Sequence, residues 1–224
     1  MPVWVIYMTF YDKDGKEYNF NHCGFINEGT TGRVYRINDT ECLKRIYFGC
    51  FQEDMFNLLS SISLNGFVKL GIPFYINNFI KAYTMEYFKK SSESILDKPM
   101  DYTIDNFEII YNDVVKLSSL RIKLYDLCWK NLIVGDSKVK VIDFDYYDKT
   151  LEEDVYYFNV ANLVSAFKLL YLKEIRLDNS INVPNMNILM DYLETLFNVD
   201  YNNPVLTLRK NLGSVKRPKD LFLK

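Results

Sequence analysis

The sequence predicts an α+β protein with two lobes, a strand-rich lobe followed by a helical one. Three observations support this prediction. Short apolar runs separated by tight turns fill the first half, apolar residues recur at helical spacing in the second half, and polar residues gather between the halves at 87–94. We therefore expect a single domain over 1–224, with one lobe at about 1–87 and the other at about 88–224.

Strands and turns account for most of the predicted first lobe. Residues 12–15, Asp-Lys-Asp-Gly, lie between two apolar runs and predict a hairpin turn. One helix is expected over 51–62, because the apolar residues at 55, 58, 59 and 62 recur at helical spacing. The predicted strands cover 3–10, 16–20, 24–26, 33–37, 41–46, 67–74 and 80–87.

Helices account for most of the predicted second lobe. Apolar residues at 107, 110, 111, 114, 115 and 117 predict an amphipathic helix over 104–120. The turn Gly135-Asp136-Ser137 predicts a hairpin of 131–134 with 138–142. Further helices are expected at 154–172 and 186–197, and the basic tail from 210 is expected to be irregular.

Composition excludes several classes of function. The net charge of −2 does not indicate a nucleic-acid partner, and no run of 18 apolar residues predicts a membrane span. With one histidine and no C-x-x-C pair among four cysteines, neither a zinc site nor a Ser-His-Asp triad is expected. Reduced thiols, and an apolar start without the basic region of a signal peptide, indicate a cytoplasmic location.

Two features of the first half can bind phosphate. Gly29 and Gly32 lie three apart in a turn between strands, where a glycine backbone can approach an anion without a clash from Cβ. Lys44 shares the face of the next strand with apolar neighbours, and therefore needs an anion: phosphate, or Glu53 or Asp54 on the following helix. Taken alone, glycine turns are common between strands, and lysines are common on edge strands.

Three polar residues surround the predicted hairpin of the second half. Asp126 precedes Asn131 by five positions, and Asp143 ends an apolar strand twelve positions after Asn131. Because Asn131 and Asp143 begin and end one hairpin, their side chains can converge on a metal ion. Mg²⁺ prefers such oxygen ligands and keeps several waters. Taken alone, Asp126 or Asn131 could simply cap a turn.

The order of these motifs resembles that of the protein kinase superfamily over about residues 24–163. The resemblance implies a two-lobed protein-kinase-like fold that binds ATP and Mg²⁺ between its lobes and transfers the γ-phosphoryl group. For nucleotide binding, it implies a glycine-rich loop of Asn27, Gly29, Gly32 and Val34, a strand lysine Lys44 paired with Glu53, and an adenine-binding hinge of Met85, Glu86 and Phe88. For catalysis, it implies that Asp126 is the base and that Asn131 and Asp143 are metal ligands. It also implies that Asp154 supports the catalytic loop.

The chain departs from the family pattern near these motifs. The arginine that usually precedes the catalytic aspartate is missing, Cys128 replaces a lysine, and Asp145 replaces the glycine of Asp-Phe-Gly at a cost in backbone freedom. Only ten residues lead from Phe144 to Asp154, so a normal activation segment does not fit. Control by phosphorylation of that segment is therefore not expected, and a regulatory protein partner can take its place.

The resemblance leaves three functions open. An active protein kinase would phosphorylate serine or threonine rather than tyrosine on a protein substrate. A small-molecule kinase of the aminoglycoside or choline type also lacks the activation segment, but the 40 residues from Glu86 to Asp126 leave little room for its substrate-binding insertion. A pseudokinase acting as a scaffold would explain the altered Cys128 and Asp145. By analogy with short bacterial effector kinases, delivery into a host cell is the alternative to a cytoplasmic location.

Overall fold

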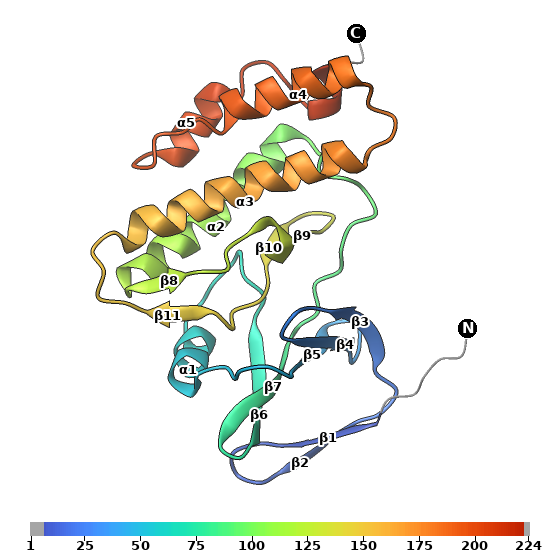
Figure 1. Ribbon diagram of the computed structural model, residues 1–224, viewed down its shortest axis with the longest axis vertical. Helices are drawn as coiled ribbons and strands as arrows, with labels where there is room; N and C mark the ends of the chain where they lie inside the picture. Colours follow the sequence, from blue (N-terminus) through green and yellow to red (C-terminus); the bar gives the residue numbers. More distant parts are fainter. Residues whose placement is uncertain (1–6, 222–224) are drawn as a thin grey trace. The chain divides into compact units, whose positions relative to one another are not determined.

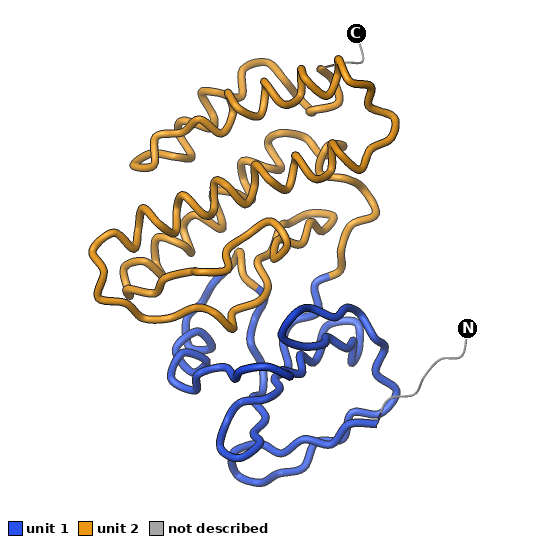
Figure 2. Tube along the Cα trace, viewed as in Figure 1, with its two compact units in different colours: residues 1–64, 68–88 blue, residues 65–67, 89–224 orange. Residues whose placement is uncertain are grey.

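The chain forms two compact units in a computed structural model that describes residues 7–221 (Figure 2). Unit 1 comprises Met1–Leu64 and Val68–Phe88, and unit 2 comprises Asn65–Phe67 and Lys89–Lys224. Unit 1 is rich in strands and unit 2 is rich in helices, so the expected mixture of α and β structure is present. The units divide after Phe88, close to the expected boundary between lobes, but Asn65–Phe67 group with unit 2.

A five-stranded antiparallel sheet is the framework of unit 1 (Figure 1). Its strand order is β3-β4-β5-β7-β6, which makes β5 the central strand with a partner on each side. The predicted strands are present, and the sixth is shifted a few residues along the chain. Their bounds are β3 (Gly24–Glu28), β4 (Gly32–Arg36), β5 (Glu41–Ile46), β6 (Leu70–Ile76) and β7 (Phe79–Glu86).

The predicted N-terminal hairpin packs on one face of this sheet. It consists of β1 (Met8–Tyr11) and β2 (Glu17–Phe20); the expected strand residues 3–6 lie outside the described residues. Met8 and Phe10 are buried while the residues that alternate with them are exposed, as expected for a strand with one covered face. Phe10 stacks on Phe74 of β6 at 5.5 Å between ring centroids. The hairpin is therefore part of the core of unit 1.

Helix α1 (Glu53–Ser61) confirms the helix expected in the first half. Its residue Phe56 packs edge-on against Tyr83 of β7, with 5.7 Å between the ring centroids. Tyr83 pairs directly with Lys44 across β5 and β7, and directly opposed residues of antiparallel strands point to the same side. Helix α1 therefore covers the sheet face that carries Lys44.

Helices form most of unit 2. The three predicted ones are present, although α2 begins four residues earlier than expected. Phe107 of α2 meets Phe167 of α3 edge-on at 5.3 Å between centroids. No helix among residues 7–221 combines the length and the apolar character needed to cross a bilayer. The bounds are α2 (Met100–Ser119), α3 (Val155–Leu177), α4 (Val183–Leu196) and α5 (Pro204–Asn211).

The C-terminal part of the chain is more regular than expected. Helix α5 was not predicted, although Asn203-Pro204 is a recognisable start, because proline favours the first helical turn. A short 3₁₀ helix, η2 (Pro218–Leu221), follows within the tail that was expected to be irregular.

Short strands of unit 2 form two small ladders. The predicted hairpin is present as β9 (Leu132–Val134) paired with β10 (Val139–Val141). A second ladder, β8 (Ile122–Leu124) with β11 (Tyr147–Lys149), was not predicted, because three residues are too few for a recognisable alternation. Both ladders lie beside the segment from Asp126 to Asn131.

Candidate functional site

Asp126 and Asn131 are hydrogen-bonded to each other. The Asn131 Nδ2 atom donates to the Asp126 carboxylate and to the Asp126 main-chain oxygen, both at 2.9 Å. Asn131 ends the 3₁₀ turn η1 (Trp129–Asn131) and is buried. These two bonds fix the amide nitrogen toward Asp126, which orients the amide oxygen as the atom able to bind a cation.

Asn131 and Asp143 flank the same end of the β9–β10 hairpin, as expected. The Ile142 amide donates to the Asn131 main-chain oxygen at 2.8 Å, which extends the ladder to the residue that precedes Asp143. The sequence therefore correctly predicted that these two residues begin and end one hairpin.

Asp143 has a left-handed backbone with φ of 69°. This conformation is uncommon outside glycine, is strained for most side chains, and often occurs at functional sites. Asp145 is not among the described residues with positive φ, so the left-handed position of this turn is Asp143.

Asn159 of α3 braces the strand that leads to Asp126. Its Oδ1 accepts from the Leu124 amide at 2.8 Å, and its Nδ2 donates to the Ile122 carbonyl at 2.8 Å and to the Ser118 hydroxyl at 2.9 Å. Asn159 is fully buried. The expected brace, Asp154, instead lies exposed at the start of α3. Sequence reasoning missed Asn159, although a polar residue within an apolar helical face is the signal that marks it.

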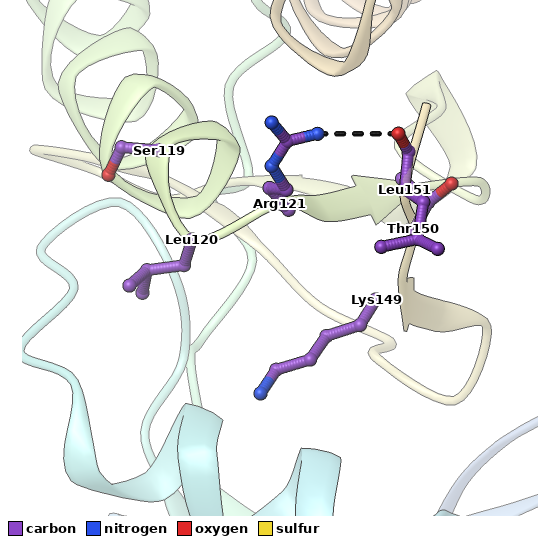
Figure 3. Close-up of a pocket in the computed structure, with 6 residues that line it drawn as sticks. All are labelled: Ser119, Leu120, Arg121, Lys149, Thr150 and Leu151. Carbon is purple, nitrogen blue, oxygen red and sulfur yellow. Dashed lines mark hydrogen bonds between the residues drawn. The ribbon is translucent and has the colours of Figure 1, made fainter. Parts of the chain in front are cut away.

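The short segment that follows Asp143 is anchored to β8. Strand β11 pairs with β8. Just after the end of β11, the Leu151 carbonyl accepts a hydrogen bond from the Arg121 guanidinium at 3.3 Å (Figure 3). Lys123 of β8 forms an ion pair with Glu152. Several residues between Phe144 and α3 therefore have partners within unit 2.

A pocket of about 400 Å³ lies at the end of the β8–β11 ladder where Ile122 pairs with Lys149 (Figure 3). None of the residues that line it belongs to the expected site. They are Ser119, Leu120, Arg121, Lys149, Thr150 and Leu151.

In unit 1, four of the expected nucleotide-binding residues share one face of the sheet. Asn27 pairs with Val34, and Val34 pairs with Lys44, so the three side chains form a row across β3, β4 and β5. Met85 lies opposite Cys42 and shares this face. Lys44 is only 5% exposed, and a buried lysine requires a compensating charge or polar partners.

The two glycines of the expected phosphate loop differ in their surroundings. A Cβ on Gly32 would lie 2.1 Å from the Arg45 carbonyl oxygen, so the approach of β5 requires glycine there. A Cβ on Gly29 would meet no atom of the described residues within 4 Å. Gly32 is therefore explained by packing, whereas Gly29 lies at an open turn, where a ligand can approach the backbone.

Glu53 is the first residue of α1 and has partners on the N-terminal hairpin and on β6. Its carboxylate accepts from the Lys13 ammonium at 2.6 Å and from the Tyr75 hydroxyl at 3.2 Å. The hydrogen bond from Lys13 is the main cause that lowers the pKa of Glu53. The pairing of Glu53 with Lys44 stays a prediction.

The expected hinge lies at the end of β7. The Glu86 amide donates to the Lys69 carbonyl at 2.8 Å, and the Glu86 carbonyl oxygen accepts from the Cys42 thiol at 3.7 Å. Because a thiol is a weak donor, this carbonyl keeps the capacity to accept a stronger hydrogen bond. Phe88, the last residue of unit 1, is half-buried.

The donor atoms around Asn131 suit a hard cation. Within residues 7–221, no group of three or more His, Cys, Asp and Glu side chains is placed to hold a metal. One carboxylate and one amide oxygen are nevertheless a typical protein contribution to Mg²⁺, which takes its other ligands from water and phosphate. No model of a known protein family and no curated protein matches the chain.

Proposed function

We propose that the protein is an ATP-dependent phosphotransferase with a two-lobed protein-kinase-like fold, acting on hydroxyl groups of a protein substrate. The observation that carries this proposal is the double hydrogen bond from Asn131 to Asp126, beside a hairpin that leads to the left-handed Asp143. This arrangement supports a base, an orienting amide and a metal-binding carboxylate in one small region of unit 2.

Asp126 acts as the base in this proposal. Its carboxylate accepts the proton of the substrate hydroxyl, and Asn131 Nδ2 holds the carboxylate in a fixed orientation. The Asn131 amide oxygen and the Asp143 carboxylate would hold Mg²⁺, which neutralises the phosphate charge when bound. The remaining catalytic effect is positioning of the phosphoryl group and the hydroxyl.

Residues of unit 1 bind the nucleotide in this proposal. Lys44 contacts the α- and β-phosphates, whose negative charge is complementary to its ammonium group. The open turn at Gly29 offers its backbone to phosphate, and Met85, Glu86 and Phe88 bind adenine.

The anchored segment after Asp143 supports activity without phosphorylation of an activation loop. The pairing of β11 with β8 and the Lys123–Glu152 ion pair hold this segment in place without a phosphate group on it. A protein partner, instead of a phosphorylated loop, then regulates the enzyme. The free thiols at all four cysteines support a cytoplasmic location, either in the producing cell or in a host cell that receives the protein.

The contact between Lys13 and Glu53 favours a second candidate function, a nucleotide-binding pseudokinase. Glu53 contacts Lys13 of the hairpin and Tyr75 of β6, whereas the kinase pattern assigns this glutamate to the strand lysine. Such a protein would bind ATP but transfer nothing.

The test is incubation of the full chain with γ-labelled ATP and Mg²⁺, with a generic protein substrate, while nucleotide binding is followed by thermal unfolding. Lys44→Ala and Asp143→Ala should abolish labelling. The controls are Arg45→Ala, which changes the exposed neighbour of Lys44, and Asp148→Ala, which changes an exposed carboxylate of β11. These two variants should label substrate as the wild type does.

The outcomes separate the candidates. Label on protein that disappears only in the Lys44 and Asp143 variants supports the kinase. Turnover that requires a small alcohol indicates a small-molecule kinase, and stabilisation by ATP without transfer indicates a pseudokinase. A chain that neither binds nor hydrolyses ATP would contradict the proposal as a whole.

A further inference from the structure

Tyr147 carries a buried hydroxyl group that the proposed mechanism does not use. It opens β11, is 3% exposed, and packs its ring edge-on against Phe144 at 5.7 Å and against Phe67 at 6.4 Å between centroids. The hydroxyl oxygen has no hydrogen-bond partner among residues 7–221. Phenylalanine would satisfy the same aromatic packing, so the packing does not explain the hydroxyl.

An unpartnered buried hydroxyl is unfavourable, because folding removes its hydrogen bonds to water and supplies none in return. Such groups are rare in folded proteins, and each calls for a specific explanation. A ligand oxygen that arrives when the site is filled is one such explanation. The position of Tyr147 in unit 2 decides whether this explanation applies.

Tyr147 lies beside the segments that carry the two aspartates of the proposed site. It pairs with Leu124, two residues before Asp126, and its amide donates at 3.0 Å to the carbonyl of Phe144, the residue after Asp143. Burial, followed by the charges of Asp143 and Asp126, raises the pKa of the Tyr147 hydroxyl well above its ordinary value. A tyrosine hydroxyl carries its proton at neutral pH and can donate a hydrogen bond to an oxygen atom.

We propose that Tyr147 is a positioning residue of the metal site, whose hydroxyl donates a hydrogen bond to an oxygen atom in the coordination sphere of the Mg²⁺ that Asn131 and Asp143 hold. This inference rests on the proposed function. Groups that hydrogen-bond to metal ligands orient them, and removal of such a group typically lowers metal affinity by about 10- to 100-fold.

Tyr192 of α4 provides a matched control. Its hydroxyl is also buried without a hydrogen-bond partner among the described residues, and burial alone raises its pKa to about 12. Helix α4 packs on α3 and contributes no residue to the proposed site. Tyr192→Phe therefore removes the same kind of atom away from any expected metal ion.

The experiment compares wild type, Tyr147→Phe and Tyr192→Phe as full chains. Thermal unfolding is measured across a series of MgCl₂ concentrations in saturating ADP, which needs no turnover. We expect Tyr147→Phe to raise the Mg²⁺ concentration for half-maximal stabilisation by about tenfold, and Tyr192→Phe to leave it unchanged. In the phosphoryl-transfer assay, Tyr147→Phe should need a higher Mg²⁺ concentration to reach half of its maximal rate. Its loss of rate relative to wild type should be smaller at saturating Mg²⁺ than at limiting Mg²⁺.

The possible results distinguish this inference from the function on which it rests. If Mg²⁺ does not stabilise the wild-type chain with ADP, the metal site fails and the inference with it. If the wild type responds and Tyr147→Phe responds at the same Mg²⁺ concentrations, the positioning role alone is overturned. A Tyr147→Phe chain that no longer folds would also overturn it, because the hydroxyl would then stabilise the free protein.

Discussion

The Lys13 ammonium lies 2.6 Å from the Glu53 carboxylate and joins the turn of the N-terminal hairpin to the first residue of α1. The two residues are 40 positions apart, and both belong to unit 1. The contact connects the hairpin, which the family pattern does not explain, to a residue that the same pattern assigns to the phosphate site. It gives the hairpin a role in positioning α1 besides its packing on β6.

The Lys13–Glu53 contact should make stability depend on acid pH. Lys13 lowers the pKa of Glu53 below its ordinary value of 4.5, so the folded state favours the ionised carboxylate. The stability that the contact adds is fully present at pH values above the pKa of Glu53 in the unfolded chain. It is lost as the pH falls through the lower pKa of Glu53 in the folded protein. Melting temperatures between pH 3 and 7 should therefore fall less steeply on the acid side for Glu53→Gln than for wild type. Asp54→Asn, at the exposed neighbour, is the control, and parallel curves for wild type and Glu53→Gln would contradict the expectation.

The two glycines of the phosphate loop should respond differently to the same substitution. Gly32→Ala places a methyl group against the Arg45 carbonyl and should destabilise the protein by about 1–3 kcal/mol. Gly29→Ala adds a methyl group in open space and should change stability by less than about 0.5 kcal/mol. If phosphate approaches this turn, Gly29→Ala should weaken ATP binding while the fold is retained. Urea unfolding and ATP titration measure the two effects, and equal loss of stability in both variants would refute the assignment.

Asn159→Ala should be strongly destabilising. The change leaves the Leu124 amide and the Ile122 carbonyl without their buried partner, and each such loss typically costs roughly 1–3 kcal/mol. Asn162, which makes one longer hydrogen bond of 3.3 Å to the Leu124 carbonyl, is the matched comparison on the same helix. Chemical denaturation should show a clearly larger loss for Asn159→Ala, and similar losses at both positions would count against this account.

Asp126→Asn should separate chemistry from binding. The amide keeps an oxygen that can accept from Asn131 Nδ2 but cannot take a proton from the substrate. Phosphoryl transfer should fall by about 10²- to 10⁴-fold, whereas stabilisation by Mg²⁺ and ATP should be retained. Asp148→Asn is the control on β11, and unchanged transfer in Asp126→Asn would exclude Asp126 as the base.

The elements defined by local pattern were predictable from the sequence. The hairpin turn at residues 12–15, the helices over most of α1 to α4, and the β9–β10 hairpin depend on turn chemistry and on periodicity over a few residues. For this reason the common location of Asn131 and Asp143 at one hairpin end followed from the sequence alone. The same holds for Lys44, whose apolar neighbours predicted a buried face.

Contacts between distant segments were decided only by the tertiary structure. The β8–β11 ladder joins three-residue strands, Asn159 binds a strand 35 positions away, and Gly32 is required by the carbonyl of Arg45 on a neighbouring strand. Nothing in the local sequence encodes these partners, because each arises when separate elements pack together. The sequence alone thus determined which chemical groups the chain carries and on which elements they lie. The packing decided which partners orient these groups, including the pairing of Tyr147 with Leu124, two residues before Asp126.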